Sequence, residues 1–392
     1  MSPNCCNPCF RSIHQRERVL YYGYKPKVKP PLKLPELLSA FPRGYLLLFS
    51  KLFVSLKKHQ LKTNQEPSID RLSCYNHPMT LTIAVDIGGT HMRVAAFPEN
   101  EKKPTFHKRI RTYTNGETSL DRLINLIQEA IPPGEHVDAV GIAVPGPVDP
   151  EKGIILTAPN LPEWEGVPIP QRIETEIGAP AFLGNDANLA ALGEWHYGAG
   201  RGHHDLIYLT ISTGIGGGVI SNDRLLLGSH GLAAELGHVT ILPDGPLCGC
   251  GQRGHLEALA SGTGIAAYVA EQLANGRKSS LSGNPDTKEI SQAAKNGDTL
   301  ANEAFQRAGH YLGLGVANYL IIFNPSIVIF GGGVSKVGDL LFKPMRETIQ
   351  KTVLSKHYLA DLVITTAELD DNAGLYGALA LARDSILSNP KL

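Results

Sequence analysis

Two rhythms of apolar and polar residues alternate along this chain from Thr80 onward. Short, nearly continuous apolar runs such as LTIAVDI and VDAVGIAVPG predict buried β-strands. Between them, the leucines and isoleucines of residues 120–131 recur mostly three or four positions apart, which predicts an amphipathic helix. This alternation of strands and helices along the chain indicates an α/β fold.

A strand followed by a glycine turn and a second strand occurs twice, in AVDIGGTHMRVAAF and in YLTISTGIGGGVIS. Each turn is therefore expected to join a β-hairpin. A dinucleotide fingerprint or a P-loop is excluded, because the glycines of those motifs lead into a helix. Two such hairpins in two similar halves predict a duplicated domain with a cleft between the copies. Further along, the pattern predicts a long helix over residues 298–323, a strand in SIVIFGGGVS and a terminal helix over residues 373–387.

Residues 1–78 differ from the rest of the chain in their proline-, lysine- and cysteine-rich stretches. Their apolar run, residues 45–56, is interrupted by Lys51 and is shorter than the roughly 20 residues that cross a bilayer. No small-residue cleavage site follows it, so a secretory signal is not expected. Met79 directly precedes a strand and is a candidate for the true start. We expect residues 1–78 to be a poorly structured extension that is non-native or dispensable; the alternatives are a targeting or interaction tail, or a lipidated or metal-binding CCNPC motif.

The net charge and the cysteine content limit the kinds of binding partner that we expect. The chain of 392 residues has 37 Lys+Arg and 37 Asp+Glu, so its formal net charge of zero gives no electrostatic reason to bind nucleic acid or an anionic membrane. Its six cysteines do not form the dense pattern of a disulfide framework. We therefore expect a cytoplasmic protein without nucleic acid or membrane partners.

The densest cluster of reactive side chains contains two imidazoles and two thiols, His238, Cys248, Cys250 and His255. These are the ligands that zinc prefers, and four of them close a tetrahedral shell. A closed shell is structural, so the pattern predicts a structural zinc and no metal-activated water. The alternative is two buried free thiols and two surface histidines. The acids at either end of the cluster, Glu235 and Glu257, are the first candidates for the chemistry.

Polar residues also end two of the predicted strands. Asn185 and Asp186 precede a helix, where a carboxylate can take a proton from a hydroxyl and an amide can orient that hydroxyl. The alternative is that Asp186 is only the N-cap of the helix. Asp86 can hold a hydrated magnesium, while Thr90 and Thr213 offer hydroxyls to phosphates beside the N–H groups of the glycine turns. Together these features favour a nucleotide site.

These segments resemble the ROK family (repressor, open reading frame, kinase), which lies within the actin/hexokinase/Hsp70-like ATPase superfamily. The resemblance is carried, in this order, by DIGGTHMRVAAF, GNDANLAALGE, TGIGGGVISNDRLLLGSHGLAAELGH, CGCGQRGHLEALASGT and IVIFGGGVS. It covers nearly everything from about Leu81 to the C-terminus. Within the family, PDGPLCGCGQRGHLE is most similar to the bacterial glucokinases.

The resemblance implies a two-lobed ribonuclease-H-like α/β fold of the actin/hexokinase type, with the active site in the cleft between the lobes. Residues 80–184 would form the small α/β lobe, joined by a C-terminal helix at about 373–392. Residues 185–372 would form the large α/β lobe with the zinc-binding loop. The resemblance also implies a homodimer or a higher homo-oligomer.

The implied activity is ATP-dependent phosphorylation of glucose at its 6-hydroxyl, with magnesium at the ATP phosphates and a structural zinc. Asp186 matches the general base of the family. The positions that match sugar-binding residues are Gly146, Asn160, Asn185, Asp186, Glu235, His238 and Glu257, and His238 would bind zinc through its other ring nitrogen. The positions that match residues around the phosphates and magnesium are Asp86, Gly88, Gly89, Thr90, Thr213, Gly214, Gly332 and Gly333.

One position departs from the family pattern, because His255 stands where the zinc segment CxCGxxGC has its third cysteine. Histidine is also a good zinc ligand, so we expect a His2Cys2 site; the alternative is a weakened or absent site. The family also contains kinases for fructose, mannose, N-acetylmannosamine and N-acetylglucosamine, members that accept polyphosphate, and repressors with an N-terminal helix-turn-helix domain. The proline-rich residues 1–78 and the intact Asp86, Thr90 and Asp186 argue against a repressor.

Overall fold

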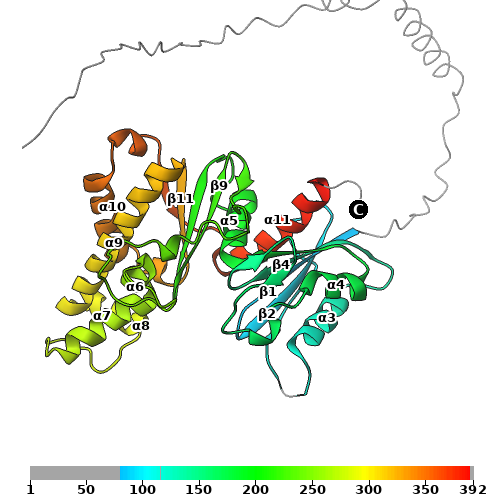
Figure 1. Ribbon diagram of the computed structural model, residues 1–392, viewed down its shortest axis with the longest axis horizontal. Coiled ribbons are helices and arrows are strands. Elements are labelled where there is room, and N and C mark those ends of the chain that lie inside the picture. The colour runs from blue at the N-terminus through cyan, green and yellow to red at the C-terminus, as the bar shows by residue number, and fades with distance from the viewer. Residues whose placement is uncertain (1–79, 115, 389–392) are drawn as a thin grey trace, which may run out of the picture. The chain divides into compact units, whose positions relative to one another are not determined.

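Most of the strands in the described part of the chain form two five-stranded sheets (Figure 1). The computed structural model describes residues 80–114 and 116–388, so the prediction for residues 1–78 lies outside the described part. The first sheet has the order β3-β2-β1-β4-β7 and consists of β1 (Thr80–Ile87), β2 (His91–Pro98), β3 (Phe106–Arg111), β4 (His136–Val144) and β7 (Ala181–Asn185). The second has the order β10-β9-β8-β11-β12 and consists of β8 (Leu206–Ile211), β9 (Ile215–Ser221), β10 (Arg224–Leu225), β11 (Ile327–Gly331) and β12 (Val363–Thr366).

Both sheets are built by the same pairing. Strand β1 pairs antiparallel with β2 and parallel with β4, and β8 pairs antiparallel with β9 and parallel with β11. The predicted glycine hairpins are therefore confirmed, with turns at residues 88–90 and 212–214. The carboxyl ends of the parallel strands lie at one edge of each sheet, the edge where α/β sheets bind ligands. A separate two-stranded ribbon pairs β5 (Val148–Asp149) with β6 (Ile154–Ile155).

The predicted helices over residues 120–131, 298–323 and 373–387 are confirmed as α3, α9 and α11. The α-helices of the described part are α3 (Ser119–Glu129), α4 (Ile169–Ile177), α5 (Asp186–Tyr197), α6 (Leu256–Ala260), α7 (Gly262–Ala274), α8 (Thr287–Lys295), α9 (Thr299–Phe323), α10 (Asp339–Thr352) and α11 (Ala373–Ser388). Short 3-10 turns are η2 (Pro162–Trp164), η3 (Leu236–His238), η4 (Val334–Val337), η5 (Lys356–Leu359) and η6 (Asp370–Asn372). Within residues 80–114 and 116–388, no helix has the length and apolarity needed to cross a membrane.

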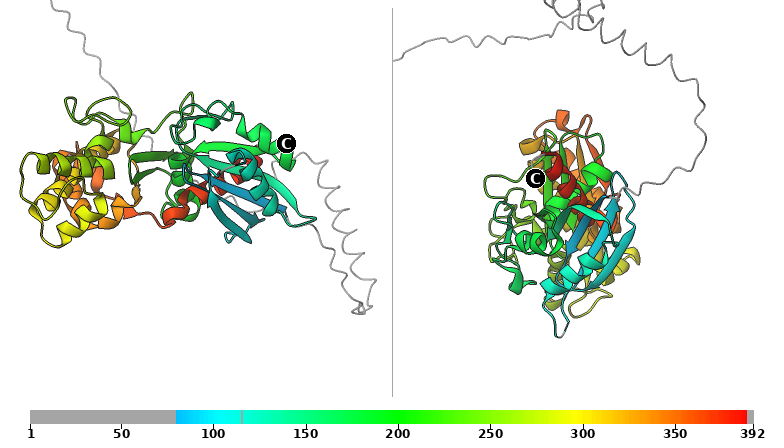
Figure 2. Two further views of the ribbon diagram at one scale, coloured as in Figure 1. Left: turned by 90° about the horizontal axis from the view of Figure 1, so that it is seen from below. Right: turned by 90° about the vertical axis from the view of Figure 1, so that its right-hand side faces the viewer.

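Helices α5 and α11 pack on each other at the centre of the fold. Helix α5 covers β8 and β9 of the second sheet. Helix α11, red in Figure 2, covers β1 and β4 of the first. Glycine makes this close approach possible, because a Cβ atom at Gly377 would lie 1.7 Å from the carbonyl oxygen of Leu189. The pair thus links the two sheets through one buried apolar cluster.

Helix α9 begins at an N-cap whose loss has a measurable expected effect. The Asp298 carboxylate accepts hydrogen bonds from the N–H groups of Ala301 and Ser280 and from the hydroxyls of Ser279 and Ser280. Burial alone would raise the pKa of Asp298, but these hydrogen bonds lower it to about 2. Asp298→Ala should therefore lower the free energy of unfolding by about 1 kcal/mol at neutral pH.

The folded-state pKa of Asp298 is below its unfolded value of 3.8, so the stabilisation is present above about pH 4 and is lost as the pH falls toward 2. The difference between wild type and Asp298→Ala in urea unfolding should shrink over that window. A difference that does not change between pH 5 and pH 2.5 would contradict the capping role.

Candidate active site

The first glycine turn is fixed by hydrogen bonds from the residue that follows β3. The Gly88 N–H donates to the carbonyl oxygen of His91 at 2.8 Å, which closes the turn between β1 and β2. The hydroxyl of Thr112, a fully buried residue just after β3, donates to the carbonyl oxygen of Gly88 at 2.6 Å. The Thr112 N–H donates to the carbonyl oxygen of Thr90 at 3.0 Å. The turn is thereby fixed while Thr90 stays exposed to solvent.

Asp86, one residue before the end of β1, forms an ion pair with Arg93 of β2. Both Nε and Nη2 of Arg93 donate to Oδ2 of Asp86, with the Nε distance at 3.0 Å. Oδ1 of Asp86 accepts no hydrogen bond from any residue that the structure describes. A half-buried carboxylate with one oxygen left open suits a hydrated divalent cation.

Asn185, and not Asp186, is the N-cap of α5. The Asn185 side-chain oxygen accepts from the N–H groups of Ala187 and Asn188 at 3.0 Å each, and its amide donates to the carbonyl oxygen of Gly146 at 2.9 Å. Gly146 fits that turn because its φ is +88° and a Cβ atom would lie 2.2 Å from the Thr157 carbonyl oxygen. The capping alternative for Asp186 therefore has no support, and its carboxylate is available for chemistry.

Asp186 has the most perturbed carboxylate of the site. Burial raises its pKa, the negative charge of Asp86 raises it further, a hydrogen bond from the Ala187 N–H at 2.7 Å opposes the shift, and Glu235 adds to it. The resulting pKa is about 7. A carboxyl group with a pKa near the working pH is suited to accept a proton in catalysis.

A cavity of about 320 Å³ gathers most of the predicted sugar residues. Its size is at the lower end of the range for small-molecule sites. The predicted residues that line it are Gly146, Asn185, Asp186, Glu235, His238, Glu257, Thr213 and Gly214. Thr210 and Ser212, which sequence reasoning missed, add hydroxyls at the end of β8. Asn160 is not among the lining residues; a Cβ atom at Gly89 would lie 2.8 Å from the Asn160 Cβ, so it sits beside the first glycine turn.

Two acids that line the cavity, Glu235 and Glu257, lie next to the cluster of histidines and cysteines. The short turn η3 brings Glu235 and His238 together, with the His238 N–H donating to the carbonyl oxygen of Glu235 at 3.0 Å. Burial raises the pKa of Glu235, with His238 opposing the shift and Glu257 adding to it. Oε2 of Glu257 accepts from the Ile215 N–H at 2.9 Å, and Cys248 Sγ lies 3.3 Å from its Oε1. Glu257 therefore contacts both the second glycine turn and the cysteine loop.

The four predicted metal ligands, His238, Cys248, Cys250 and His255, have donor atoms that all lie within 4.8 Å of one another. Bonds of about 2.0–2.3 Å in a tetrahedron place neighbouring ligand atoms about 3.3–3.8 Å apart. Cys248 Sγ lies 3.7 Å from His238 Nδ1, and Cys250 Sγ lies 3.2 Å from His255 Nδ1. The donor types therefore suit zinc, and these two pairs have about the spacing of a tetrahedral shell.

The backbone of residues 245–255 explains why the cysteines converge. The Cys248 N–H donates to the carbonyl oxygen of Gln252 at 2.7 Å, and the Gly251 N–H donates back to that of Cys248 at 2.9 Å. Gly254 has a φ of +71°, and a Cβ atom there would lie 1.5 Å from the Leu242 carbonyl oxygen. The tight turn therefore requires glycine at this position.

Residues 82–385 match the ROK family. The chain belongs to this family. The predicted family and the actin/hexokinase-type fold are thereby confirmed.

Relatives in the ROK family match this chain over most of its length. The glucokinase of Thermotoga maritima is 39% identical over 318 residues, which is 79% of this chain and 99% of that protein. A solved structure of a ROK family glucokinase from Streptomyces griseus in complex with glucose and AMPPNP is 37% identical, with a TM-score of 0.64 over 78% of this chain and 99% of that chain. The xylose repressor of Caldicellulosiruptor bescii is 33% identical over 285 residues, which is 70% of this chain and 71% of the repressor.

A second, larger cavity of this ROK protein adjoins the first and measures about 530 Å³. The two share Ser212 and Thr213 of the second glycine turn. The predicted Gly333 also lines the larger cavity, and Gly332, with a φ of +84°, forms the turn before it. Sequence reasoning missed its lining residues on α7, α8 and η4, which include Thr263, Asp286, Thr287, Lys288, Ser291 and Lys336. The run SGTG at residues 261–264 is the one local signal that points to it.

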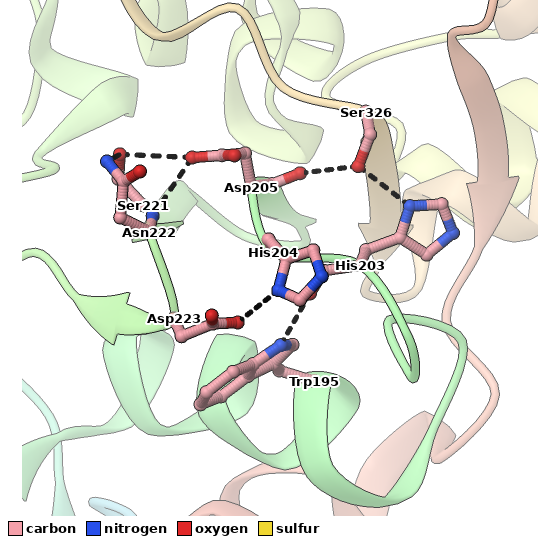
Figure 3. A network of polar contacts seen from close by, with 8 residues as sticks. All are labelled: Trp195, His203, His204, Asp205, Ser221, Asn222, Asp223 and Ser326. Atoms are coloured by element: carbon pink, nitrogen blue, oxygen red, sulfur yellow. Dashed lines mark hydrogen bonds and ion pairs between the residues drawn. The ribbon is translucent and has the colours of Figure 1, made fainter. Parts of the chain in front are cut away.

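A polar network lies at the opposite end of β8 (Figure 3). His203 Nδ1 is 2.8 Å from the Ser326 hydroxyl, which donates to the carbonyl oxygen of Asp205 at 3.0 Å. The Asp205 carboxylate accepts from the Ser221 hydroxyl at 3.1 Å and from the Asn222 N–H at 3.0 Å. The network ties the starts of β8 and β11 to the β9–β10 turn.

Proposed function

We propose that this ROK protein is a sugar kinase that transfers the γ-phosphoryl group of ATP to the 6-hydroxyl of glucose. The observation that carries the proposal is that one cavity is lined by Asp186, whose pKa is about 7, together with Glu235, His238 and the second glycine turn. The glucokinases that match most of this chain, one of them solved with glucose and AMPPNP, support glucose as the acceptor.

In the proposed mechanism Asp186 holds the 6-hydroxyl and takes its proton as the oxygen attacks the γ-phosphorus. The new phosphorus–oxygen bond forms while the bond to the β-phosphate oxygen breaks, and ADP carries away the electron pair. Such a transition state needs positioning and charge neutralisation more than covalent chemistry. Magnesium, when bound through Asp86, would neutralise charge on the phosphates. Asn185, whose amide is fixed on Gly146, would orient the hydroxyl beside Asp186.

The nucleotide would occupy the larger cavity, with its phosphates directed to the second glycine turn at Thr213 and Gly214. The contiguity of the two cavities supports this placement, because Thr213 lines both. Gly332 and Gly333 would border the nucleotide from β11, and Gly88, Gly89 and Thr90 would approach the phosphates from the first sheet. Asn160, which lies next to Gly89, is assigned to the same margin of the site.

The four-residue cluster would hold a structural zinc. Zinc would cross-link the loop of residues 245–255 to η3 and so fix the two acids that face the sugar. Because His238 presents Nδ1 to Cys248, its Nε2 is the nitrogen available to a sugar hydroxyl.

A coupled assay over several sugars tests the proposed acceptor. We expect the highest kcat/KM with glucose and ATP, and values at least about tenfold lower with fructose, mannose, N-acetylmannosamine and N-acetylglucosamine. Polyphosphate in place of ATP tests the donor. Another hexose that exceeds glucose by about tenfold would contradict the assignment, and a full-length protein that binds a specific operator would favour the regulator class represented by the xylose repressor.

A further inference from the structure

Arg93 uses its donors on two separate parts of the molecule. Besides the ion pair with Asp86, its Nη2 donates to the carbonyl oxygen of Asp371 at 2.6 Å, and its Nη1 donates to the side-chain oxygen of Asn372 at 3.3 Å. Asp86 and Arg93 are direct cross-strand partners of β1 and β2, which keeps the two side chains on one face of the sheet. The planar guanidinium makes all of these contacts in one fixed orientation.

Asp371 and Asn372 belong to the segment that joins the two sheets at the end of the chain. This segment, residues 367–372, runs from β12 of the second sheet to α11, which covers the first (Figure 1). Its other end is fixed by the buried Glu194 of α5, whose carboxylate accepts from the N–H groups of Glu368 at 3.1 Å and Leu369 at 2.8 Å. The segment is therefore anchored on both sides and offers Arg93 a fixed support.

Asp86 lies in a site with several negative charges, so the cation that pairs with it affects the charge balance of the site. Asp86 and Glu235 both act electrostatically on Asp186, so three carboxylates share the site before any phosphate enters. Arg93 is the cation paired with Asp86 among the described residues. Its side chain is only 19% exposed, so solvent screens the pair weakly. Arg93 also occupies Oδ2 of Asp86 and leaves Oδ1 as the open oxygen.

We propose that Arg93 is a positioning residue for the magnesium-bound nucleotide: it orients the Asp86 carboxylate and fastens it to the segment between β12 and α11. Arg93 touches neither substrate in this assignment and acts through Asp86. The inference rests on the proposed kinase function, since magnesium and nucleotide are the ligands that Asp86 would serve.

Calorimetric titration of magnesium-AMPPNP and, separately, of glucose tests the inference on the full chain. Arg93→Met should weaken magnesium-AMPPNP binding by roughly tenfold or more, because the half-buried Asp86 carboxylate loses its charged donor. Glucose affinity should stay within about twofold, since the glucose-facing acids are not bound to Arg93. Arg93→Lys should recover part of the loss. Asn372→Ala, which removes one anchor of Arg93, should produce a smaller loss in the same direction.

Arg383→Met is the matched control. Arg383 also ties α11 to the first sheet, by donating to the carbonyl oxygens of Pro98 and Glu101 at 3.0 Å each, but it does not contact Asp86. It should alter the melting temperature without changing nucleotide affinity. If Arg93→Met, Arg93→Lys and Asn372→Ala all bind magnesium-AMPPNP as wild type does, the inference is wrong. If wild type itself binds neither ligand, the proposed function is what fails. Should Arg93→Met not fold, the lysine and Asn372 variants decide.

Discussion

Asp186→Ala is expected to lower kcat by about 10²–10⁴-fold, the range that a general base contributes. Glucose binding should persist, because Glu235, His238 and Glu257 remain in place around the cavity. Steady-state kinetics together with calorimetric titration of glucose separate these two effects. Asp121→Ala is a suitable control, since Asp121 also lies in the first turn of a helix, α3, but its side chain is 49% exposed and it does not line the cavity. Full activity of Asp186→Ala would exclude Asp186 as the base.

The pH dependence provides a second test of the same residue. Asp186 must be ionised to accept a proton, so kcat/KM should fall as the pH drops through about 7, the pKa that burial, Asp86 and Glu235 give it. The folded-state pKa lies above the unfolded value of 3.8, so protonated Asp186 stabilises the fold below about pH 4 and that contribution is lost between pH 4 and pH 7. Asp186→Asn should therefore melt at or above the wild-type temperature at pH 8.

Cys248→Ser is expected to remove most of the bound zinc and to raise KM for glucose by about 10–100-fold. Cys248 is buried and contacts both His238 and Glu257, so loss of its thiolate releases two residues of the cavity. The effect on kcat should be smaller, because Asp186 is held by α5 and not by this loop. Metal analysis and kinetics of the purified variant provide the measurements.

His255→Ala tests the unusual ligand and should also reduce zinc content, whereas His230→Ala, at an exposed histidine outside the cluster, should not. Wild-type protein expressed in zinc-replete medium should carry about one equivalent of zinc. A content below about half an equivalent would contradict the zinc assignment.

Local patterns were sufficient to predict much of the fold. The two glycine hairpins could be predicted because a hairpin pairs neighbours in sequence, and the long helix α9 because its apolar positions and the Asp298 cap are contiguous. The His/Cys cluster spans only residues 238–255, so its ligands also converge through short turns. In each case the interacting residues lie close together along the chain.

Contacts between distant segments were the part that could not be predicted. In the sequence Arg93 looks like an ordinary strand residue. Its contacts with Asp371 and Asn372 could not be predicted, because they depend on how α11 is placed. Lys288 and Lys336 line one cavity although they come from different elements with no shared motif. The N-cap of α5 is a finer case, because Asn185 and Asp186 are both good capping residues and only the observed hydrogen bonds distinguish them.

The position of α11 has a consequence for how the protein folds during synthesis. The strands of the first sheet are among the earliest parts of the described chain to leave the ribosome, but the helix that covers β1 and β4 is the last. At a synthesis rate of about 5–20 residues per second, α11 is completed roughly 15–60 s after β1. During that interval the apolar surface of β1 and β4 lacks α11, and transiently exposed apolar surface of this kind is prone to aggregation.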